Sequence, residues 1–452
     1  MTTICAPATS TGGAIAIVRI SGPDTFTIID NIFSKRITDA NGYTVHFGQI
    51  KDHANDETID DVLVTVFRAP HSYTGEDSAE VSCHASPYIV ERICQLLMSN
   101  GCQAAMPGEF TRRAFMNGKL DLSQAEAVAD LIASSNRASH QIALNQLKGG
   151  FSSELNDLRE HLLHLTTLLE LELDFSDHEE LEFADRTELV NLVQTIDRRI
   201  DSLIRTFKTG QAIKKGIPVA IIGATNVGKS TLLNQLLHED KAIVSDVHGT
   251  TRDVIEDTVT INGITFRFID TAGIRSTDDE IERLGIERTY MKLQEAQIIL
   301  WMLDTIPEKE TVEHIMSLVG EKSLIVVFNK IDTVQHDGTA LSALLHVREI
   351  VSISAKYGTN ISALEDAIYA AAHIPDIHNS DVIVTNIRHY DALCHARAHL
   401  EQVHQAMIQN VSAELIAEDL RSVLADLAEI TGGQISTQET LSNIFSHFCV
   451  GK

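Results

Sequence analysis

The sequence predicts a multidomain protein of mixed α/β and α+β class, with an N-terminal α+β domain, a discontinuous helical domain and an α/β domain inserted into it. The chain has 452 residues, more than one hydrophobic core usually serves, which predicts about three domains. Between residues 216 and 376, short β-branched apolar runs alternate with helical patterns, as in a parallel sheet covered by helices. Helical periodicity dominates on both sides of this region.

Residues 1–117 are predicted to form the α+β domain, because strand-like runs are mixed there with helical patterns. The predicted strands are residues 13–20, 44–50, 61–67 and 78–83, and helices are expected near residues 23–33 and 87–100. These patterns indicate no ligand by themselves.

Residues 118–215 and 377–452 are predicted to form the two segments of the helical domain. Seven large apolar residues recur three or four positions apart and predict one continuous helix: Leu144, Leu147, Phe151, Leu155, Leu158, Leu162 and Leu165. Further helices are expected over residues 186–208, 390–411 and 414–430, the last ended by Gly432 and Gly433. The simplest packing joins both segments into one domain, so that residues 216–376 form an insertion whose ends lie close together.

The inserted region begins with the pattern of a phosphate-binding loop. An apolar run at residues 217–222 precedes Gly223-Ala-Thr-Asn-Val-Gly-Lys-Ser230, and residues 231–237 are predicted to be helical. Two glycines allow a tight turn whose N–H groups face phosphate oxygens, Lys229 reaches the β- and γ-phosphates, and Ser230 contacts a bridging Mg²⁺. A strand-to-helix turn without a ligand is the alternative. The residues assigned here to the nucleotide are Asn226, Val227, Gly228, Lys229, Ser230 and Thr231.

Two later segments indicate that the nucleotide is GTP. Residues 323–328 predict a strand that runs into Asn329-Lys-Ile-Asp332, where Asp332 can accept hydrogen bonds from N1–H and the exocyclic amine of guanine. Another predicted strand, residues 349–354, leads to a backbone that can close over the base. Together the motifs predict a Ras-like P-loop GTPase domain that binds GTP at the carboxyl ends of its strands. The assigned residues are Asn329, Lys330, Asp332, Ser354, Ala355 and Lys356.

Two segments between these motifs are expected to respond to the γ-phosphate. One follows a strand-like run that ends at residue 270, and it comprises Asp270, Thr271, Ala272 and Gly273. The other is a loop before the strand pattern at residues 254–261, and it comprises Ser245, Asp246, Val247, His248, Gly249, Thr250 and Thr251. We expect Thr251 to bind Mg²⁺ together with Ser230.

The usual catalytic glutamine is missing after the second segment. Ile274 occupies the position where many GTPases carry the glutamine that orients the attacking water. The acidic stretch at residues 278–282 is the nearest source of another polar group, and Glu282 is our candidate. A solvated acidic face is the alternative interpretation.

Asn226 has two interpretations. Its amide oxygen, with carbonyls of residues 245–250, can hold a monovalent cation that neutralises charge between the β- and γ-phosphates. Alternatively, the side chain supports the loop, because asparagine tolerates a left-handed backbone.

Composition excludes several classes of protein. With 36 basic and 63 acidic residues, the net charge of −27 excludes nonspecific coating of nucleic acid but not a local RNA site. No stretch approaches the roughly 18 apolar residues of a membrane span, and the N-terminus lacks the basic start of a signal peptide, so a cytoplasmic location is expected. The six cysteines show no disulfide or zinc spacing.

These motifs, with several long markers elsewhere, resemble the MnmE family of tRNA-modifying GTPases, also called TrmE. The markers are Arg19-Ile-Ser-Gly22, Ser72-Tyr-Thr-Gly-Glu-Asp77, residues 107–122, Gln124-Ala-Glu-Ala127 and Phe448-Cys-Val-Gly-Lys452. The resemblance implies a homodimer formed by the N-terminal domain. It also implies a MnmG/GidA-like flavoprotein partner that carries FAD in a heterotetramer, and an aminomethyl-type modification of the wobble uridine of tRNA.

The resemblance also assigns residues. A tetrahydrofolate one-carbon donor is expected at Arg19, Glu80, Lys119 and Lys452, a potassium ion at Asn226, Ser245, Val247 and Thr250, and catalytic roles at Glu282 and Cys449. Without it, Arg19 and Glu80 are ordinary charges at strand ends and Cys449 is a small buried apolar residue.

The chain departs from the family pattern at two places. Thr225 stands where proline is usual, with little expected effect. His84-Ala85-Ser86 replaces His-Gly-Gly, which predicts an altered folate pocket if those glycines permit a close backbone approach.

Two other functions remain as alternatives. An Era-like ribosome-assembly switch shares the GTPase motifs, but such proteins usually carry an RNA-binding module such as a KH domain, and the C-terminal segment has no GxxG loop between strand patterns. A folate-binding scaffold with a degenerate GTPase conflicts with the intact motifs.

Overall fold

The computed structural model describes residues 2–10, 12–174, 186–240, 257–269, 294–320, 322–333, 349–374, 382–409, 411–433, 441, 444–446, 448 and 451. The chain divides into two compact units. The first comprises Met1–Ile132, Gln146–Arg198 and Asp391–Lys452, and the second comprises Ala133–Asn145 and Arg199–Tyr390. The boundaries of the four segments predicted above, at residues 117, 215 and 376, stay predictions.

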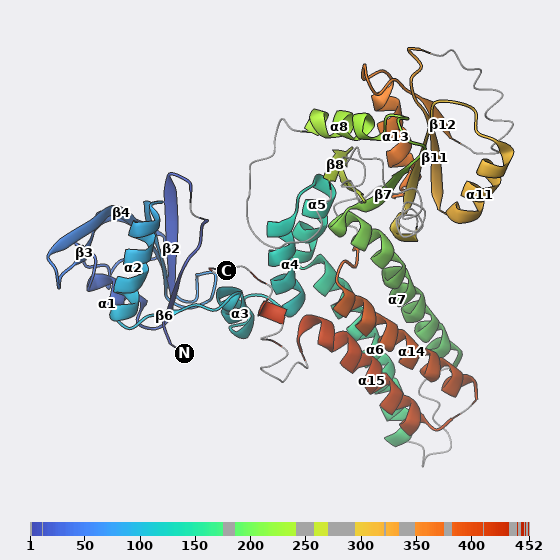
Figure 1. Ribbon diagram of the computed structural model, residues 1–452. Coiled ribbons are helices and arrows are strands. Elements are labelled where there is room, and N and C mark those ends of the chain that lie inside the picture. The colour runs from blue at the N-terminus through green and yellow to red at the C-terminus, as the bar shows by residue number, and fades with distance from the viewer. Residues whose placement is uncertain are drawn as a thin grey trace. The chain divides into compact units, whose positions relative to one another are not determined.

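A six-stranded sheet forms the N-terminal part of the first unit (Figure 1). Its strands are β1 Ile4–Pro7, β2 Ile15–Ser21, β3 Thr44–Asp52, β4 Glu57–Phe67, β5 Ser78–His84 and β6 Gln103–Ala104. Their order is β3-β4-β5-β2-β1-β6, with antiparallel pairing except between β1 and β6. The four predicted strands are confirmed, whereas β1 and β6 were missed because they are too short to show alternation.

Helices α1 Thr25–Asp30 and α2 Pro87–Ser99 cover one face of this sheet, and they do not cover the other face. Both helices share a hydrophobic core with the inward-facing side chains of β2, β4 and β5. Phe110, on α3 Glu109–Met116, packs in a separate small cluster with Ile4 and Ala6 of β1. The predicted α+β class of residues 1–117 is therefore confirmed.

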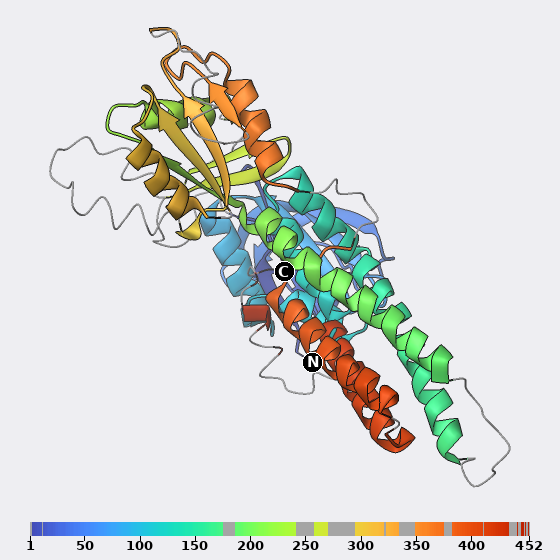
Figure 2. The ribbon, with the colours of Figure 1, turned by 90° about the vertical axis from the view of Figure 1, so that its right-hand side faces the viewer.

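Long helices form the rest of the first unit. They are α4 Leu122–Ala133, α6 Gly150–Asp174, α7 Arg186–Lys215 as far as Arg198, α14 Ile387–Ile408 from Asp391 onward, and α15 Ala413–Thr431. Helices α6 and α15 pack side by side, and Arg397 of α14 lies 3.4 Å from Asp197 of α7 (Figures 1 and 2). Gly432 ends α15 in a left-handed conformation, as its position in the sequence predicts.

The prediction of one continuous helix through residues 144–165 is wrong. Helix α5 Arg137–Leu147 ends before Gly149, whose φ of +87° is not helical, and α6 starts at Gly150. The apolar periodicity continues across this break, so periodicity alone could not reveal it. Beyond the break the stripe from Phe151 to Leu165 is buried.

A second six-stranded sheet, with order β12-β11-β10-β7-β9-β8, forms the centre of the second unit (Figure 2). Its strands are β7 Ile217–Ile222, β8 Asp257–Ile261, β9 Ile264–Phe268, β10 Ile298–Leu303, β11 Ser323–Phe328 and β12 Ile350–Ser352. Only β8 runs antiparallel to its neighbour. Helices α8 Lys229–Asp240 and α13 Ile361–Ala371 pack on one face and α11 Lys309–Val319 on the other, which is the predicted α/β arrangement.

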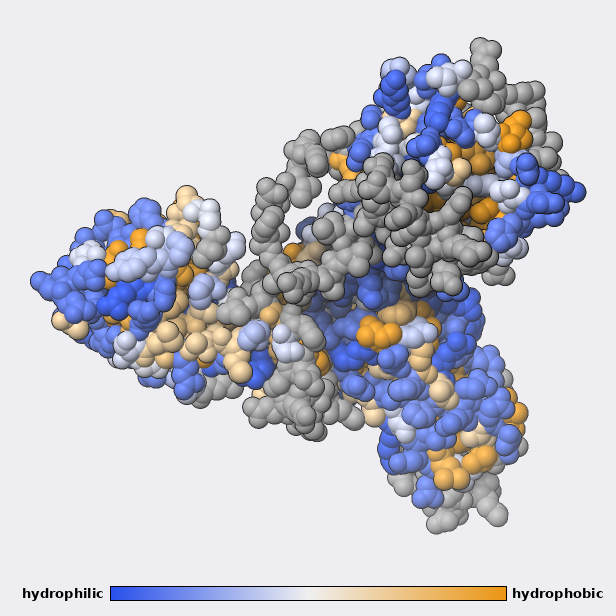
Figure 3. All heavy atoms as spheres, in the orientation of Figure 1, coloured by the Kyte–Doolittle hydropathy of each residue, from blue (hydrophilic) through white to orange (hydrophobic). Residues whose placement is uncertain are grey.

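No helix in the part of the chain that the structure describes is long and apolar enough to cross a membrane. On the face shown in Figure 3, hydrophilic residues cover most of the described surface and apolar residues are scattered among them.

Candidate functional site

The phosphate loop lies at the carboxyl end of β7, the strand between β10 and β9 in the second sheet. Gly223 has φ +150°, and a Cβ there would lie 2.4 Å from the carbonyl oxygen of Met302 at the end of β10. Gly228 has φ +99°, and its Cβ would lie 2.3 Å from Nδ2 of Asn329. Both positions therefore require glycine, because the backbone has a positive φ and because the carbonyl of Met302 and the side chain of Asn329 leave no room for a Cβ.

Lys229 is the first residue of α8 and its side chain folds back over the loop. Its Nζ donates to the carbonyl oxygens of Gly223 at 2.6 Å and Ala224 at 2.8 Å. The ammonium group is thus held at the mouth of the loop, beside the N-terminus of α8, where N–H groups and the helix dipole favour an anion. Ser230 follows in the first turn of the same helix.

Asn329 connects three of the predicted motifs. Its Nδ2 donates to the carbonyl of Val227 in the phosphate loop at 2.7 Å, and its Oδ1 accepts from the backbone N–H of Ala355 at 2.9 Å. The side chain is buried, so each bond is protected from water. Segments more than 100 residues apart in the sequence therefore meet at one side chain.

The remaining residues of the base-binding segment are also fixed. Oδ1 of Asp332 accepts from Oγ of Ser354 at 2.5 Å. Lys330 has φ +67°, and its Nζ lies 2.7 Å from Asp304, which directly follows β10. These contacts leave the Asp332 carboxylate beside the backbone of Ser354 at the strand ends.

The donor chemistry of this region fits the predicted ions. Asn226 is exposed on the loop with φ +60°, and its amide oxygen suits K⁺, because carbonyl oxygens can replace the hydration shell of that ion. The left-handed backbone also agrees with the alternative role of Asn226 in loop conformation. The hydroxyl of Ser230 suits Mg²⁺.

Many of the predicted nucleotide and ion residues lie outside the described residues. They are Ser245, Asp246, Val247, His248, Gly249, Thr250, Thr251, Asp270, Thr271, Ala272, Gly273 and Glu282. Cys449 and Lys452 also lie outside them. Their assignments stay predictions.

A second polar site lies on the first sheet, on the face that α1 and α2 do not cover. Arg19 of β2 stands directly opposite Glu80 of β5, and its Nε and Nη2 lie 2.9 and 2.8 Å from Oε1 of Glu80. Nη1 donates to the carbonyl of Gly451 at 3.1 Å. The guanidinium carbon lies 5.8 Å from the centroid of the Tyr73 ring and 5.7 Å from that of Phe110, within the range of cation–π attraction.

This arrangement fits an anionic ligand with a flat polar ring. A guanidinium has five N–H donors, so Arg19 retains donors beyond the three directions already used. Lys119, exposed, donates from Nζ to the carbonyl of Pro70 at 3.0 Å and has two further N–H groups. The hydroxyl of Tyr73 bonds to Thr111, and burial raises the pKa of Tyr73, so the phenol stays neutral at ordinary pH.

The substituted segment His84-Ala85-Ser86 is removed from this pair. His84 stands opposite Ile15 at the far end of the two strands, and its ring and backbone N–H bond to Asp60. Four residues along a strand separate it from Glu80, about 13 Å at 3.3 Å per residue. The substitution therefore does not touch the Arg19–Glu80 pair within the chain.

Sequence reasoning missed several residues that shape both sites. Asp304, Tyr73 and Phe110 received no role, although each follows a strand or stands in a motif that had been noted. The ion pair between Glu76 and the buried Arg113 was missed as well. A signal for Arg113 existed, since Glu109 precedes it by one helical turn within the motif at residues 107–122.

Family models match most of the chain. A model described as the GTP-binding protein TrmE N-terminus matches residues 3–119, and one described as the MnmE helical domain matches residues 122–449.

Curated relatives match along the whole length. Three of them are named tRNA modification GTPase MnmE. The protein from Phocaeicola vulgatus is 50% identical over 494 residues, which cover 100% of this chain and 99% of the relative. Those from Parabacteroides distasonis and Bacteroides thetaiotaomicron are each 52% identical, over 100% of this chain and 100% and 99% of the relatives. With both family models and full-length relatives in agreement, the chain belongs to the MnmE family of GTPases.

Proposed function

We propose that this protein hydrolyses GTP in order to modify the wobble uridine of certain tRNAs, adding an aminomethyl or carboxymethylaminomethyl group at position 5. The observation that carries the proposal is that the similarity spans the N-terminal and helical parts as well as the GTPase domain. Relatives named for tRNA modification share the whole chain rather than the nucleotide-binding part alone.

The second unit binds GTP. Lys229 and the N-terminus of α8 hold the phosphates, and Asp332 accepts hydrogen bonds from the guanine edge while its other contact, Ser354, fixes the carboxylate. Asn329 holds the phosphate loop and the base segment in register, so phosphate and base are bound by one preorganised surface.

Hydrolysis depends on groups that replace the usual catalytic glutamine. Ser230 and Thr251 bind Mg²⁺, and Asn226, Ser245, Val247 and Thr250 hold K⁺. A cation between the phosphates would supply positive charge where negative charge develops. Glu282 orients the attacking water directly or through a second water.

The polar site of the first unit binds a tetrahydrofolate derivative. Arg19, Lys119 and Lys452 pair with the carboxylates of its glutamate tail, and Glu80 accepts from the N–H groups of the pterin ring. Folate supplies a one-carbon unit when bound. The carbonyl of Gly451 accepts a hydrogen bond from Arg19, and Cys449, two positions earlier in the sequence, is the proposed catalytic thiol.

The open face of the first sheet supports a homodimer. Five large apolar side chains are exposed there, which defines the outer face: Ile15, Tyr43, Val45, Phe47 and Leu63. Phe47 of β3 stands opposite Leu63 of β4, and Phe47 is 59% exposed. Exposed large apolar side chains on one face of a sheet are typical of an interface, and a second copy of the chain is our proposed occupant.

A MnmG/GidA-like flavoprotein that carries FAD is the proposed partner in a heterotetramer, and tRNA is the substrate of the assembly in the cytoplasm. GTP hydrolysis drives closure of the paired GTPase domains and is not the source of the transferred group.

Mass spectrometry of tRNA nucleosides tests the function. In a strain that lacks this gene, wobble uridines should lose the modification, and expression of the intact gene should restore it. Normal wobble uridines together with immature ribosomal particles would instead support the Era-like alternative.

A further inference from the structure

The loop at residues 72–77 contacts two of the cations assigned to folate. The ring of Tyr73 lies beside the Arg19 guanidinium. Gly75 has φ +78°, and a Cβ there would lie 3.3 Å from Cγ of Lys119 and from Cβ of Asn117, so the stem of Lys119 packs on the glycine. The position of this loop therefore affects both Arg19 and Lys119.

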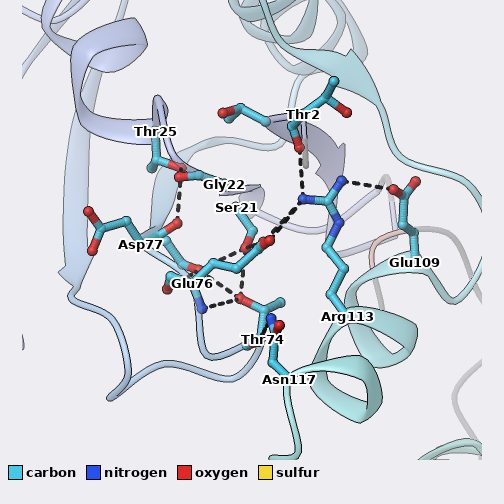
Figure 4. A network of polar contacts seen from close by, with 12 residues as sticks. Thr2, Ser21, Gly22, Thr25, Thr74, Glu76, Asp77, Glu109, Arg113 and Asn117 are labelled. Carbon is cyan, nitrogen blue, oxygen red and sulfur yellow. Dashed lines mark hydrogen bonds and ion pairs between the residues drawn. The ribbon is translucent and has the colours of Figure 1, made fainter.

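Glu76 anchors the loop through polar contacts with Arg113 and Ser21 (Figure 4). Its carboxylate accepts from Nη1 of Arg113 at 3.1 and 3.3 Å and from Oγ of Ser21 at 2.8 Å. Ser21 also bonds to Oγ1 of Thr74 at 2.7 Å. Ser21 lies two residues after Arg19 on β2, so the strand that carries the cation also holds the loop.

Arg113 makes this anchor rigid. Its side chain is 6% exposed, and besides Glu76 it donates to Oε1 of Glu109 at 3.0 Å and to the carbonyl of Thr2 at 2.8 Å. A buried charge with several well-placed partners has one favourable position, because any displacement leaves a charge or a donor unpaired. Figure 4 shows the guanidinium between Glu76, Glu109 and Thr2.

Asn117 fixes the loop from the other end. Its Nδ2 donates to the carbonyl of Thr74 at 2.7 Å (Figure 4), and Lys119 follows two residues later. Asn117 is itself exposed, so this contact links the loop and the Lys119 segment without a buried charge.

We propose that Glu76 and Arg113 are positioning residues for the folate site. The ion pair of Glu76 with the buried Arg113 holds the loop so that Tyr73 and Gly75 fix the positions of Arg19 and Lys119 before the ligand binds. Preorganisation of this kind raises affinity because less ordering remains to be done on binding. The inference rests on the proposed folate site and adds residues that do not touch the ligand.

The test is isothermal titration calorimetry of the full-length protein with 5-formyltetrahydrofolate, a one-carbon derivative that is stable in air. Glu76→Gln keeps the shape of the side chain and removes its charge. We expect the dissociation constant for folate to rise about tenfold, which is a loss of about 1.4 kcal/mol in binding free energy. Asn117→Ala changes an exposed residue and should weaken folate binding by a smaller factor. This variant still tests the position of the loop if Glu76→Gln does not fold. The affinity for GTP should not change in either variant.

Arg92→Lys is the matched control, because Arg92 pairs with the buried Asp52 in the same domain but away from the loop. It should leave folate affinity unchanged. In the reconstituted modification reaction, Glu76→Gln should raise the KM for folate and leave kcat at saturating folate unchanged. General destabilisation of the fold would instead lower the concentration of active enzyme, and with it the apparent kcat.

The outcomes separate the two proposals. If wild-type protein binds no folate, both the folate site and the positioning role are overturned. If Arg19→Ala abolishes binding while Glu76→Gln and Asn117→Ala bind like wild type, the site stands and the positioning role is overturned.

Discussion

The side-chain amide of Asn329 donates a hydrogen bond to the backbone carbonyl of Val227 at 2.7 Å, and this contact ties the base-binding segment to the phosphate loop. Gly228 lies so close that a Cβ would overlap the same amide nitrogen. The Asn329 amide therefore needs a glycine at position 228, and the conformation of the phosphate loop depends on its contact with the base-binding segment.

Asn329→Asp should weaken nucleotide binding. The variant removes the N–H donor and leaves the buried carbonyl of Val227 unpaired, which costs about 1–3 kcal/mol, or roughly 5- to 150-fold in affinity. Titration with a fluorescent GDP analogue measures this. Asn360→Asp is the control, since its amide makes a similar bond to the carbonyl of Ser352 at an exposed position. Equal losses in both variants would contradict the role of Asn329.

Hydrolysis should be faster in potassium than in sodium. If Asn226 helps to hold K⁺ against the phosphates, wild-type protein should gain at least about tenfold in kcat, a small part of the ~10³–10⁵ that an arginine finger supplies. Asn226→Ala should lose this dependence on the cation, while Thr225→Ala, its exposed neighbour, should keep it. Equal rates of wild type in the two salts would rule out the cation.

Glu282→Ala should bind GTP normally and hydrolyse it slowly. A group that orients the attacking water contributes about 10²–10⁴ to the rate, and Ile274 offers no replacement. Single-turnover hydrolysis and nucleotide titration separate the two effects. Glu280→Ala, in the same acidic stretch, should retain activity, and a loss of rate in both variants would favour a general effect of negative charge.

Local patterns predicted two strands of the nucleotide site accurately, whereas the strand β10, which leads into Asp304, was missed. The strands β7 and β11 begin and end at the predicted residues, because short, fully buried apolar runs bounded by glycine or polar residues are strong signals. The break at Gly149 escaped prediction, since apolar spacing continues on both sides of it.

Local sequence patterns could not predict contacts between residues that are far apart in the chain. Asp304 meets Lys330 only because β10 and β11 are neighbours, and Arg113 of α3 meets Glu76 only because the loop before β5 lies beside α3. Spacing in the sequence carries no information about such pairs. The sequence shows residues 72–77 as a family marker, but only the structure shows that this loop contacts Arg19 through Tyr73.

Phe47→Glu should convert the proposed dimer to a monomer. If a second copy packs on the outer face, the carboxylate of the new glutamate is buried there without a partner. Burial of an unpaired charge costs free energy and disfavours the dimer. Multi-angle light scattering during size-exclusion chromatography gives the mass. Met98→Glu is the matched control, because Met98 is 41% exposed on α2, outside the outer face. A dimer that persists in Phe47→Glu would place the interface elsewhere.

Asp52 should make the N-terminal domain sensitive to acid. The hydrogen bond from the Asn55 amide is the main cause that lowers the pKa of Asp52, and the Ala54 N–H and Arg92 add to it against the opposing effect of burial. A carboxyl whose pKa is lower in the folded state stabilises that state above its unfolded pKa, about 3.9, and the contribution disappears as the pH falls through the folded value.

Asp52→Asn should therefore melt below wild type near neutral pH, and the difference should shrink once the pH falls below about 4. Differential scanning calorimetry of both proteins across this range is the measurement. Asp61→Asn, an exposed carboxyl on the same hairpin that accepts from the Gln49 amide, is the control and should change the melting temperature less. A difference between wild type and Asp52→Asn that stays constant down to pH ~2 would show that packing, and not the charge of Asp52, accounts for its contribution.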